Sequence, residues 1–330
     1  MLTEMDDSDP AAHATNIAET AARLDRRPWL AQPLRPRTEL SFEYFPPTSR
    51  DGWNQLADTF EQLTPFAPTF ASVTYGAGGT TRMRTQRTIE TLASAYDTEI
   101  AGHLTGVAAT RADVHRLVDQ YAGIPIRRLV ALRGDPPATA DGPVAQGFET
   151  AEDLVRSLRD RPDGATWDIS VAGYPETHPR ATSRAADLDA LRRKVDAGAD
   201  RVITQFFFDN DAFFGFVDDA RTAGIDVPIV PGIMPVHDFA SVVRFATRCG
   251  ATVPQWMHDL FEPIDDPSIQ QMVAATVMAE QVRGLIEWGV QHLHVYTLNR
   301  GDLTEAALRM LGYVPTTADV IELPGEQQVG

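Results

Sequence analysis

The 330-residue sequence has little of what several protein classes require. Cys249 is the only cysteine, so the chain can form no internal disulfide and no cysteine-based zinc or iron–sulfur site. No apolar run reaches the ~18 residues that cross a bilayer, and no apolar stretch of a secretion signal follows Arg26 and Arg27. The sequence has 29 Lys and Arg but 46 Asp and Glu, and the resulting net charge of −17 argues against a general binder of nucleic acid. A cytoplasmic protein that binds neither membrane nor nucleic acid is expected.

The composition predicts a folded core with irregular ends. Hydrophobic residues make up 43% of the chain and charged residues 23%, enough to bury a core. Residues 1–36 are expected to form a flexible extension with a short helix, which Pro28, Pro33 and Pro36 end. Residues 315–330 are expected to form an acidic tail. Residues 37–314 remain for a single domain.

Short β-like runs alternate with amphipathic stretches through this domain. The predicted strands are 39–45, 70–75, 99–105, 128–132, 168–174, 201–207, 228–231 and 292–297. The predicted helices are 53–63, 82–95, 111–121, 152–159, 184–197, 211–223, 238–248, 267–288 and 303–311. Eight strands in this alternation predict a (β/α)8 barrel, with a doubly wound open sheet as the alternative. In such a barrel, functional residues gather where the strands end.

Glu43 is the clearest candidate for acid–base chemistry. It lies in an aromatic strand, and the two-residue period of a strand puts it on one face with Ser41 and Phe45. A carboxyl group in such a partly dry site is expected to have a raised pKa, which suits a general acid. The structural alternative is a glutamate that faces water on an edge strand, but a closed barrel has no edge strand.

Two other segments are polar where a ligand could be held. Asp135 follows Arg133 and Gly134 at the end of a predicted strand. Because Gly-Asp-Pro-Pro is also strong turn chemistry, a turn residue and a functional carboxylate both remain open. The basic run at 192–194, on a predicted helix, is either a solvated face or a site for the pyrophosphate of a cofactor.

Two further motifs are weak. Residues 76–81 are glycine-rich and follow a predicted strand, but they lack the third glycine and the later acidic residue of the dinucleotide fingerprint, so a loop is predicted. His292 and His294 share a strand face and could supply half of a metal site. The pattern places no third ligand, so structural histidines are predicted and no metal is expected.

Distinctive motifs lie at or near the ends of the predicted strands. They are Ser-Phe-Glu-Tyr-Phe-Pro-Pro (41–47), Ser-Val-Thr-Tyr-Gly (72–76), His-Leu-Thr (103–105), Leu-Arg-Gly-Asp (132–135), Tyr-Pro-Glu-Thr-His-Pro (174–179), Arg-Arg-Lys-Val-Asp-Ala-Gly-Ala (192–199), Ile-Thr-Gln-Phe-Phe-Phe-Asp (203–209), Pro-Gly-Ile-Met-Pro (231–235) and Tyr-Thr-Leu-Asn-Arg (296–300). As a set, these motifs resemble those of methylenetetrahydrofolate reductases. The resemblance extends from about residue 38 to 313.

The resemblance implies a (β/α)8 barrel that has the length of the family's catalytic domain and binds FAD without covalent attachment. NADH or NADPH would reduce the FAD and leave. The substrate 5,10-methylenetetrahydrofolate would take its place and be reduced to 5-methyltetrahydrofolate, which feeds methionine synthesis. The implied partners are therefore two small molecules, a folate and a nicotinamide dinucleotide, and a homo-oligomer is expected.

Carried over residue by residue, the resemblance also implies roles. Glu43 matches the general acid that opens the five-membered ring of the folate, and Asp135 matches a carboxylate near the pyrimidine end of the flavin that also contacts the pterin. The positions that match flavin contacts are Thr74, His103, Leu132, Arg133, Gly134, Asp135, Ala172, Tyr174, His178, Asp187, Arg193, Lys194 and Ala199. The positions that match folate or nicotinamide contacts are Glu43, Asp135, Gln205, Phe245 and Arg300.

Two positions depart from the family pattern. Ala190 stands where a flavin-contacting Asn is common, and Ser241 where a Gln is common near the substrate. Altered affinity is expected, not a lost function. The alternatives are a flavin-independent reductase of the same folate and a folate- or flavin-binding barrel without turnover. Residues 132–135 and 193–194 favour FAD, and Glu43 with Asp135 favours an enzyme.

Overall fold

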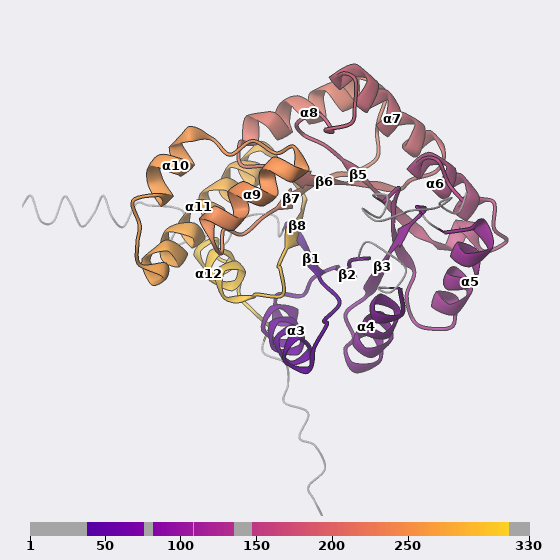
Figure 1. Ribbon diagram of the computed structural model, residues 1–330, viewed down its shortest axis with the longest axis horizontal. Helices are drawn as coiled ribbons and strands as arrows, with labels where there is room; N and C mark the ends of the chain where they lie inside the picture. The colour runs from indigo at the N-terminus through magenta and orange to yellow at the C-terminus, as the bar shows by residue number, and fades with distance from the viewer. Residues whose placement is uncertain (1–37, 76–81, 108, 135–146, 317–330) are drawn as a thin grey trace, which may run out of the picture.

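The computed structural model describes residues 38–75, 82–107, 109–134 and 147–316. Within them, eight parallel strands close into one barrel in chain order (Figure 1). They are β1 (Glu39–Tyr44), β2 (Phe70–Val73), β3 (Ile100–Thr105), β4 (Arg128–Leu132), β5 (Asp168–Gly173), β6 (Arg201–Phe206), β7 (Ile229–Ile233) and β8 (His292–Tyr296). The closed ring confirms the predicted (β/α)8 fold and excludes the open sheet, which would leave two edge strands.

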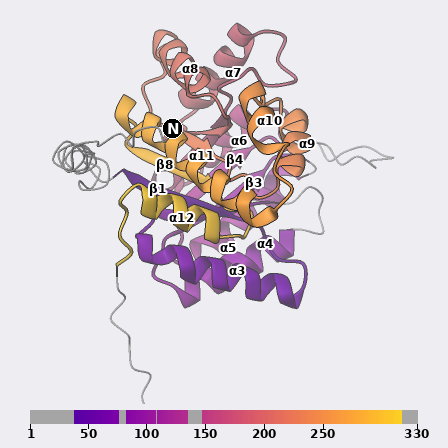
Figure 2. The same ribbon diagram turned by 90° about the vertical axis from the view of Figure 1, so that its left-hand side faces the viewer.

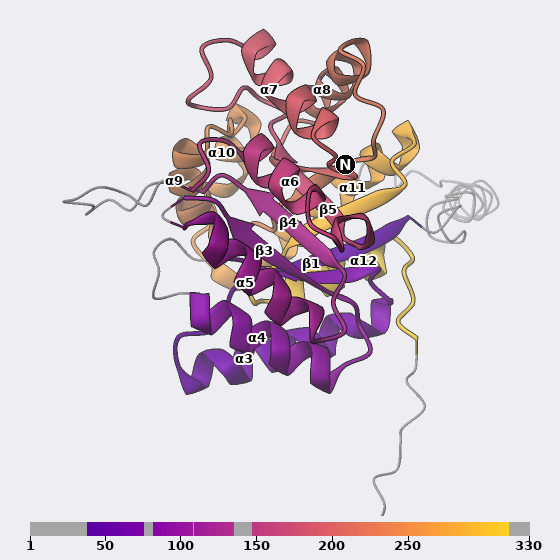
Figure 3. The same cartoon turned by 90° about the vertical axis from the view of Figure 1, so that its right-hand side faces the viewer.

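Helices cover the outside of this ring. They are α3 (Arg50–Leu63), α4 (Arg82–Ala95), α5 (Arg111–Ala122), α6 (Ala151–Arg159), α7 (Arg184–Asp196), α8 (Asn210–Thr222), α9 (Phe239–Cys249), α10 (Gln255–Phe261), α11 (Pro267–Trp288) and α12 (Asp302–Met310). The side views place α3 and α4 on one flank of the barrel and α7 and α8 on the opposite flank (Figure 2, Figure 3). Among the described helices, none is both long and apolar enough to span a membrane.

The predicted extension at 1–36 and the glycine-rich loop at 76–81 lie outside the described residues, and so does nearly all of the acidic tail. The bounds of every predicted strand agree with the structure to within two residues. The helix that the sequence reasoning missed is α10, which has only seven residues and follows Pro254 without a side-chain cap. Its short length gives too little periodicity to detect.

Side-chain caps fix where several helices begin after the strands. Thr110 before α5 and Thr150 before α6 each form a capping box with the aspartate three residues later. The Ser183 hydroxyl accepts from the Ala186 amide at the start of α7. Each cap stabilises its helix by about 1 kcal/mol, so the loops that leave β3, β4 and β5 end at defined points.

The strands separate an outer core from an inner one, as the two-residue alternation predicts. On β1, Phe42 and Tyr44 are fully buried in the outer core under the helices, and the Tyr44 ring lies 5.2 Å from that of Phe60. The inner core is a separate, smaller cluster at the centre of the barrel. It consists of Phe70, Ala101, Val130, Ile203 and Val230, with Leu132 packed against it.

A β-bulge interrupts the regular pairing of β6 with β7. Ile203 pairs with Val230 but Phe206 pairs with Gly232, so β6 carries one more residue than its partner here. The Gly232 amide donates to the Thr204 hydroxyl oxygen at 3.0 Å in place of a ladder bond. The bulge thus has its own hydrogen bond at the carboxyl end of the barrel.

Candidate functional site

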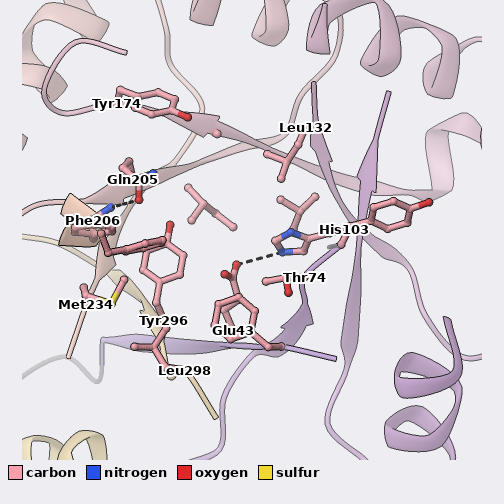
Figure 4. Close-up of a pocket in the computed structure, with 16 residues that line it drawn as sticks. Glu43, Thr74, His103, Leu132, Tyr174, Gln205, Phe206, Met234, Tyr296 and Leu298 are labelled. Atoms are coloured by element: carbon pink, nitrogen blue, oxygen red, sulfur yellow. Dashed lines mark hydrogen bonds and ion pairs between the residues drawn. The ribbon is translucent and has the colours of Figure 1, made fainter. Parts of the chain in front are cut away.

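A cavity of about 300 Å³ opens at the carboxyl ends of the strands, where the fold predicts a site. Figure 4 shows Glu43 and His103 pointing toward one another on one side of it and Phe206 with Tyr296 on the other. Every strand, or the residues just after it, contributes to the lining. The lining residues are Glu43, Phe45, Thr74, Tyr75, His103, Val130, Leu132, Ala172, Tyr174, Ile203, Gln205, Phe206, Met234, Phe245, Tyr296 and Leu298.

Glu43 is nearly buried between two imidazoles. Its side chain is 13% exposed, and its Oε2 lies 3.2 Å from His103 Nε2 on β3 and 3.5 Å from His294 Nε2 on β8 (Figure 4). Burial raises the pKa of Glu43, but the charges and hydrogen bonds of the two imidazoles lower it by more, to about 2. The predicted raised pKa is therefore wrong for the free protein. The sequence reasoning counted burial and missed the two histidines, which come from other strands.

A second pair of contacts holds His294 in place. Its Nδ1 lies 2.8 Å from the Ser41 hydroxyl oxygen, which is also 2.9 Å from His292 Nε2. The register of β1 with β8 sets this arrangement, because Ser41 pairs with His294 and Glu39 pairs with His292. The two histidines share a face, as predicted. Among the described residues, no group of three or more potential ligands is placed to hold a metal ion.

Because the pKa of Glu43 is lowered, the free energy of unfolding is expected to depend on pH in the acidic range. The ionised group stabilises the folded state fully above its ordinary pKa of 4.5, and this stabilisation is lost as the pH falls through about 2. We expect it to account for about 3 kcal/mol of unfolding free energy across that window. Urea unfolding from pH 6 to pH 2 measures it. Glu43→Gln should lose most of this dependence, and parallel curves for the two proteins would contradict the assignment.

A second cavity, of about 230 Å³, adjoins the first and shares Leu132, Ala172 and Tyr174 with it. Its remaining lining residues are Ala131, Arg133, Gly134, Ala151, His178, Arg180 and Lys194. Three of these, Arg133, Arg180 and Lys194, are Arg or Lys. The two cavities therefore share a wall, and the first is mainly apolar and aromatic whereas the second carries positive charge.

Lys194 is a half-buried cation of the second cavity. Its Nζ donates to the Ala172 carbonyl at 2.5 Å. Burial lowers the pKa of Lys194 to about 8, although Asp187 opposes this shift. Gly134 lies nearby in the left-handed region at φ +80°, where an added Cβ would lie 2.7 Å from a methyl carbon of Val107. A side chain at residue 134 would therefore distort this turn.

Other predicted flavin contacts divide into lining and supporting residues. The rings of Tyr174 and His178 meet edge to face at 4.4 Å, and both line the second cavity. Asp187 accepts from the His178 amide at 2.9 Å and so holds that loop. Ala199 is buried and donates its amide to the Lys194 carbonyl. Asp187 and Ala199 line neither cavity.

The structure separates Arg193 from Lys194. The Arg193 side chain is 47% exposed and pairs with Glu152 at 3.1 Å and with Asp189. It lines neither cavity, so its predicted contact with a cofactor stays a prediction. Asp135 lies outside the described residues, and its predicted roles stay predictions too.

The predicted substrate residues are only partly brought together. Gln205 and Phe245 line the first cavity, and Phe245 stacks on Phe206 with ring centroids 5.5 Å apart. Arg300 is exposed and lies outside the lining. Ser241, one of the two departures, lies in the first turn of α9, where its amide donates to Asp238 at 2.7 Å.

Sequence reasoning missed several lining residues, and it missed that His294 contacts Glu43 and that Ser41 contacts His294. Ser41 was placed on the same face as Glu43 but given no role, and His294 was read as structural. The two-residue period of each strand was the sequence signal that could have placed these side chains on one face. The missed lining residues include Phe206, Met234, Tyr296 and Leu298.

Comparison with known proteins adds a family. Residues 31–312 match the family described as methylenetetrahydrofolate reductase. The 5,10-methylenetetrahydrofolate reductase of Pectobacterium carotovorum subsp. carotovorum is 42% identical over 286 residues, covering 86% of this chain and 94% of that protein. The enzyme of the same name from Escherichia coli (strain K12) is 41% identical over 277 residues, covering 84% and 91%.

One solved structure shows the same fold at low identity. It is described as an uncharacterized protein from Clostridium thermocellum that binds two copies of 5-methyl-5,6,7,8-tetrahydrofolic acid. It superimposes with a TM-score of 0.58 at 13% identity and covers 83% of this chain and 94% of its own. At that identity the likeness concerns the fold alone.

Proposed function

This chain belongs to the methylenetetrahydrofolate reductase family, and from that premise we propose that it reduces 5,10-methylenetetrahydrofolate to 5-methyltetrahydrofolate in the cytoplasm. NADH or NADPH supplies a hydride, water supplies one proton, and the product feeds methionine synthesis. Identity of 41–42% to two bacterial reductases over more than nine tenths of their length supports the reaction. The observation that carries the proposal is Glu43, a nearly buried carboxyl group held by two imidazoles where all eight strands converge.

We further propose FAD, bound without covalent attachment, as the cofactor. FAD supplies a two-electron carrier between the nicotinamide and the folate. The residues present fit it, because a flat ring joined to a diphosphate needs an apolar wall beside a basic one. Leu132, Ala172 and Tyr174, which both cavities share, would flank the ring, and Arg133 and Lys194 would hold the diphosphate.

The chain's own residues supply the proton chemistry and the binding surface. Glu43 would pass a proton to N10 of the folate as the five-membered ring opens, with His103 and His294 orienting the carboxyl group. The stacked rings of Phe206 and Phe245 offer a flat surface for a pterin or a nicotinamide. Tyr296 donates its hydroxyl to the Thr204 carbonyl at 2.6 Å and so holds the opposite wall.

The separation of Lys194 from Arg193 gives a matched test of the cofactor site. Lys194→Met should weaken FAD binding by about tenfold or more, because a charge-assisted contact to the diphosphate would be lost. Arg193→Met should change it by less, since that guanidinium faces Glu152 and Asp189. Equilibrium dialysis of FAD against each variant measures both constants. An equal effect at the two positions would contradict the assignment.

An anaerobic two-step assay tests the function. NADH should bleach the absorbance of the bound flavin, and 5,10-methylenetetrahydrofolate should restore it, with 5-methyltetrahydrofolate identified by mass spectrometry. A colourless protein that makes the product directly from NADH would support the flavin-independent alternative. Tight folate binding without product would support the non-catalytic barrel.

A further inference from the structure

A continuous row of polar groups runs from Glu43 through the barrel interior to the opposite end of the strands. His294 Nε2 lies 3.5 Å from Glu43, and its Nδ1 lies 2.8 Å from Ser41. The Ser41 hydroxyl oxygen is 2.9 Å from His292 Nε2, and His292 Nδ1 is 3.5 Å from Glu39 Oε2. The row alternates between β1 and β8, because each member sits on the inward face of its strand.

The two ends of this row differ in their access to water. The side chains of Ser41 and His294 are fully buried, and that of His292 is 11% exposed. Glu39 is 60% exposed and lines a cavity of about 140 Å³ at the amino end of the barrel, with Thr69 and Tyr313. The row therefore connects water at one end of the barrel with the site at the other.

We propose that Glu39 and His292 are positioning residues that form the outer half of a proton path, through which Glu43 regains its proton from the amino-terminal end of the barrel. This inference rests on the proposed function, which consumes one proton in each turnover. A folate and a cofactor in the adjoining cavities would cover Glu43 from the carboxyl end. The row through the interior remains open to water while they are bound.

Hydrogen-bond polarity along the row is consistent with transfer. The proposed path assigns one tautomer to each ring: before a transfer, His294 Nε2–H donates to the Glu43 carboxylate and its Nδ1 accepts from the Ser41 hydroxyl. The Ser41 oxygen accepts from His292 Nε2–H, which leaves His292 Nδ1 facing Glu39. A proton that passes from Glu39 to His292 Nδ1 moves each later hydrogen one place along, so Glu43 gains one proton. The imidazoles and the hydroxyl return to their first arrangement before the next transfer.

The surroundings of His292 favour a neutral ring, which has the one donor and one acceptor that a relay needs. Burial, the His294 ring and two guanidinium groups lower the pKa of His292 to about 3. Those guanidinium groups, Arg201 and Arg128, both pair with Asp168 and lie over the Phe70 ring. Thr69 is a further polar neighbour, with its hydroxyl 3.5 Å from His292 Nε2.

The kinetic test compares two carboxylates at the same end of the barrel. Glu39→Gln should slow the folate step by about tenfold and leave flavin reduction by NADH unchanged, because only the former needs the proton. Glu99→Gln is the control: it removes a carboxylate that pairs with Arg128 at 2.8 Å and stands outside the row. Equal folate rates for wild type and Glu39→Gln would overturn the proposal.

Chemical rescue separates a relay from a structural role. In His292→Ala, added imidazole should restore the folate step, whereas thiazole, which fills the same space but carries no N–H, should not. Rescue by both molecules would show that His292 only fills space.

A third measurement does not depend on catalysis. The 15N shifts of His292 and His294 should report ring tautomers that change together in Glu39→Gln. An unchanged His294 tautomer would show that the residues of the row are not coupled, and it would overturn the proposal. A coupled response in a protein that makes no 5-methyltetrahydrofolate would instead refute the proposed function alone.

Discussion

Glu43→Gln is expected to slow reduction of the folate by ~10²-fold or more, the usual loss when a general acid is removed. Glutamine keeps the size of the side chain, and its oxygen can still accept from His103 and His294, which lie 3.2 Å and 3.5 Å from the native carboxylate. It has no proton to give to the leaving nitrogen of the folate. Reduction of the bound flavin by NADH does not use that proton and should proceed at the wild-type rate.

Stopped-flow absorbance of the flavin measures each step separately in the same preparation. The NADH step is thus an internal control for the shape of the cavity. Equal slowing of both steps would mean that the substitution distorts the site, and it would remove Glu43 from the role of acid.

Gly232→Ala is expected to have a large effect on the fold, a loss of about 3 kcal/mol of unfolding free energy. An added Cβ would lie 2.2 Å from the Thr204 carbonyl oxygen, which is backbone and cannot turn aside. It would also lie 2.6 Å from the Tyr296 ring, so β6 and β8 would both have to move. The cavity wall that Tyr296 forms should deform as well, which weakens folate binding.

Gly215→Ala is the matched control, a glycine within α8 whose added Cβ would meet nothing within 4 Å. Alanine there should raise stability by about 0.5–1 kcal/mol, because glycine costs more backbone entropy in a helix. Urea unfolding compares the two. A Gly232→Ala protein as stable as the wild type would show that the barrel widens freely at this point.

The fold could be predicted from local sequence patterns, because each strand and helix is specified by residues that are close together in the sequence. Alternation and length were enough to place Arg128–Leu132 and Pro267–Trp288 at the bounds that the structure has. Closure of the ring followed from the count of strands. The short helix α10 has too few turns for its period to stand out.

The site was less predictable because it depends on strands that are distant in the sequence. Glu43 was found from its own strand, but its pKa is set by His103 and His294, which are 60 and 251 residues away. Lys194 and Arg193 are neighbours in the chain, yet the turn of the helix sends one into the cavity and the other to the surface. Neither outcome can be read from adjacent residues.

The bulge in β6 changes how this site can be altered by evolution. In a regular strand, neighbouring side chains point to opposite faces, yet Gln205 and Phe206 both line the cavity. The extra residue thus places a hydrogen-bonding amide beside an aromatic ring on the same wall. Lineages that insert or delete one residue here would exchange which side chains meet the substrate without any substitution. Ligand preference at this wall can therefore diverge through strand register as well as through residue identity.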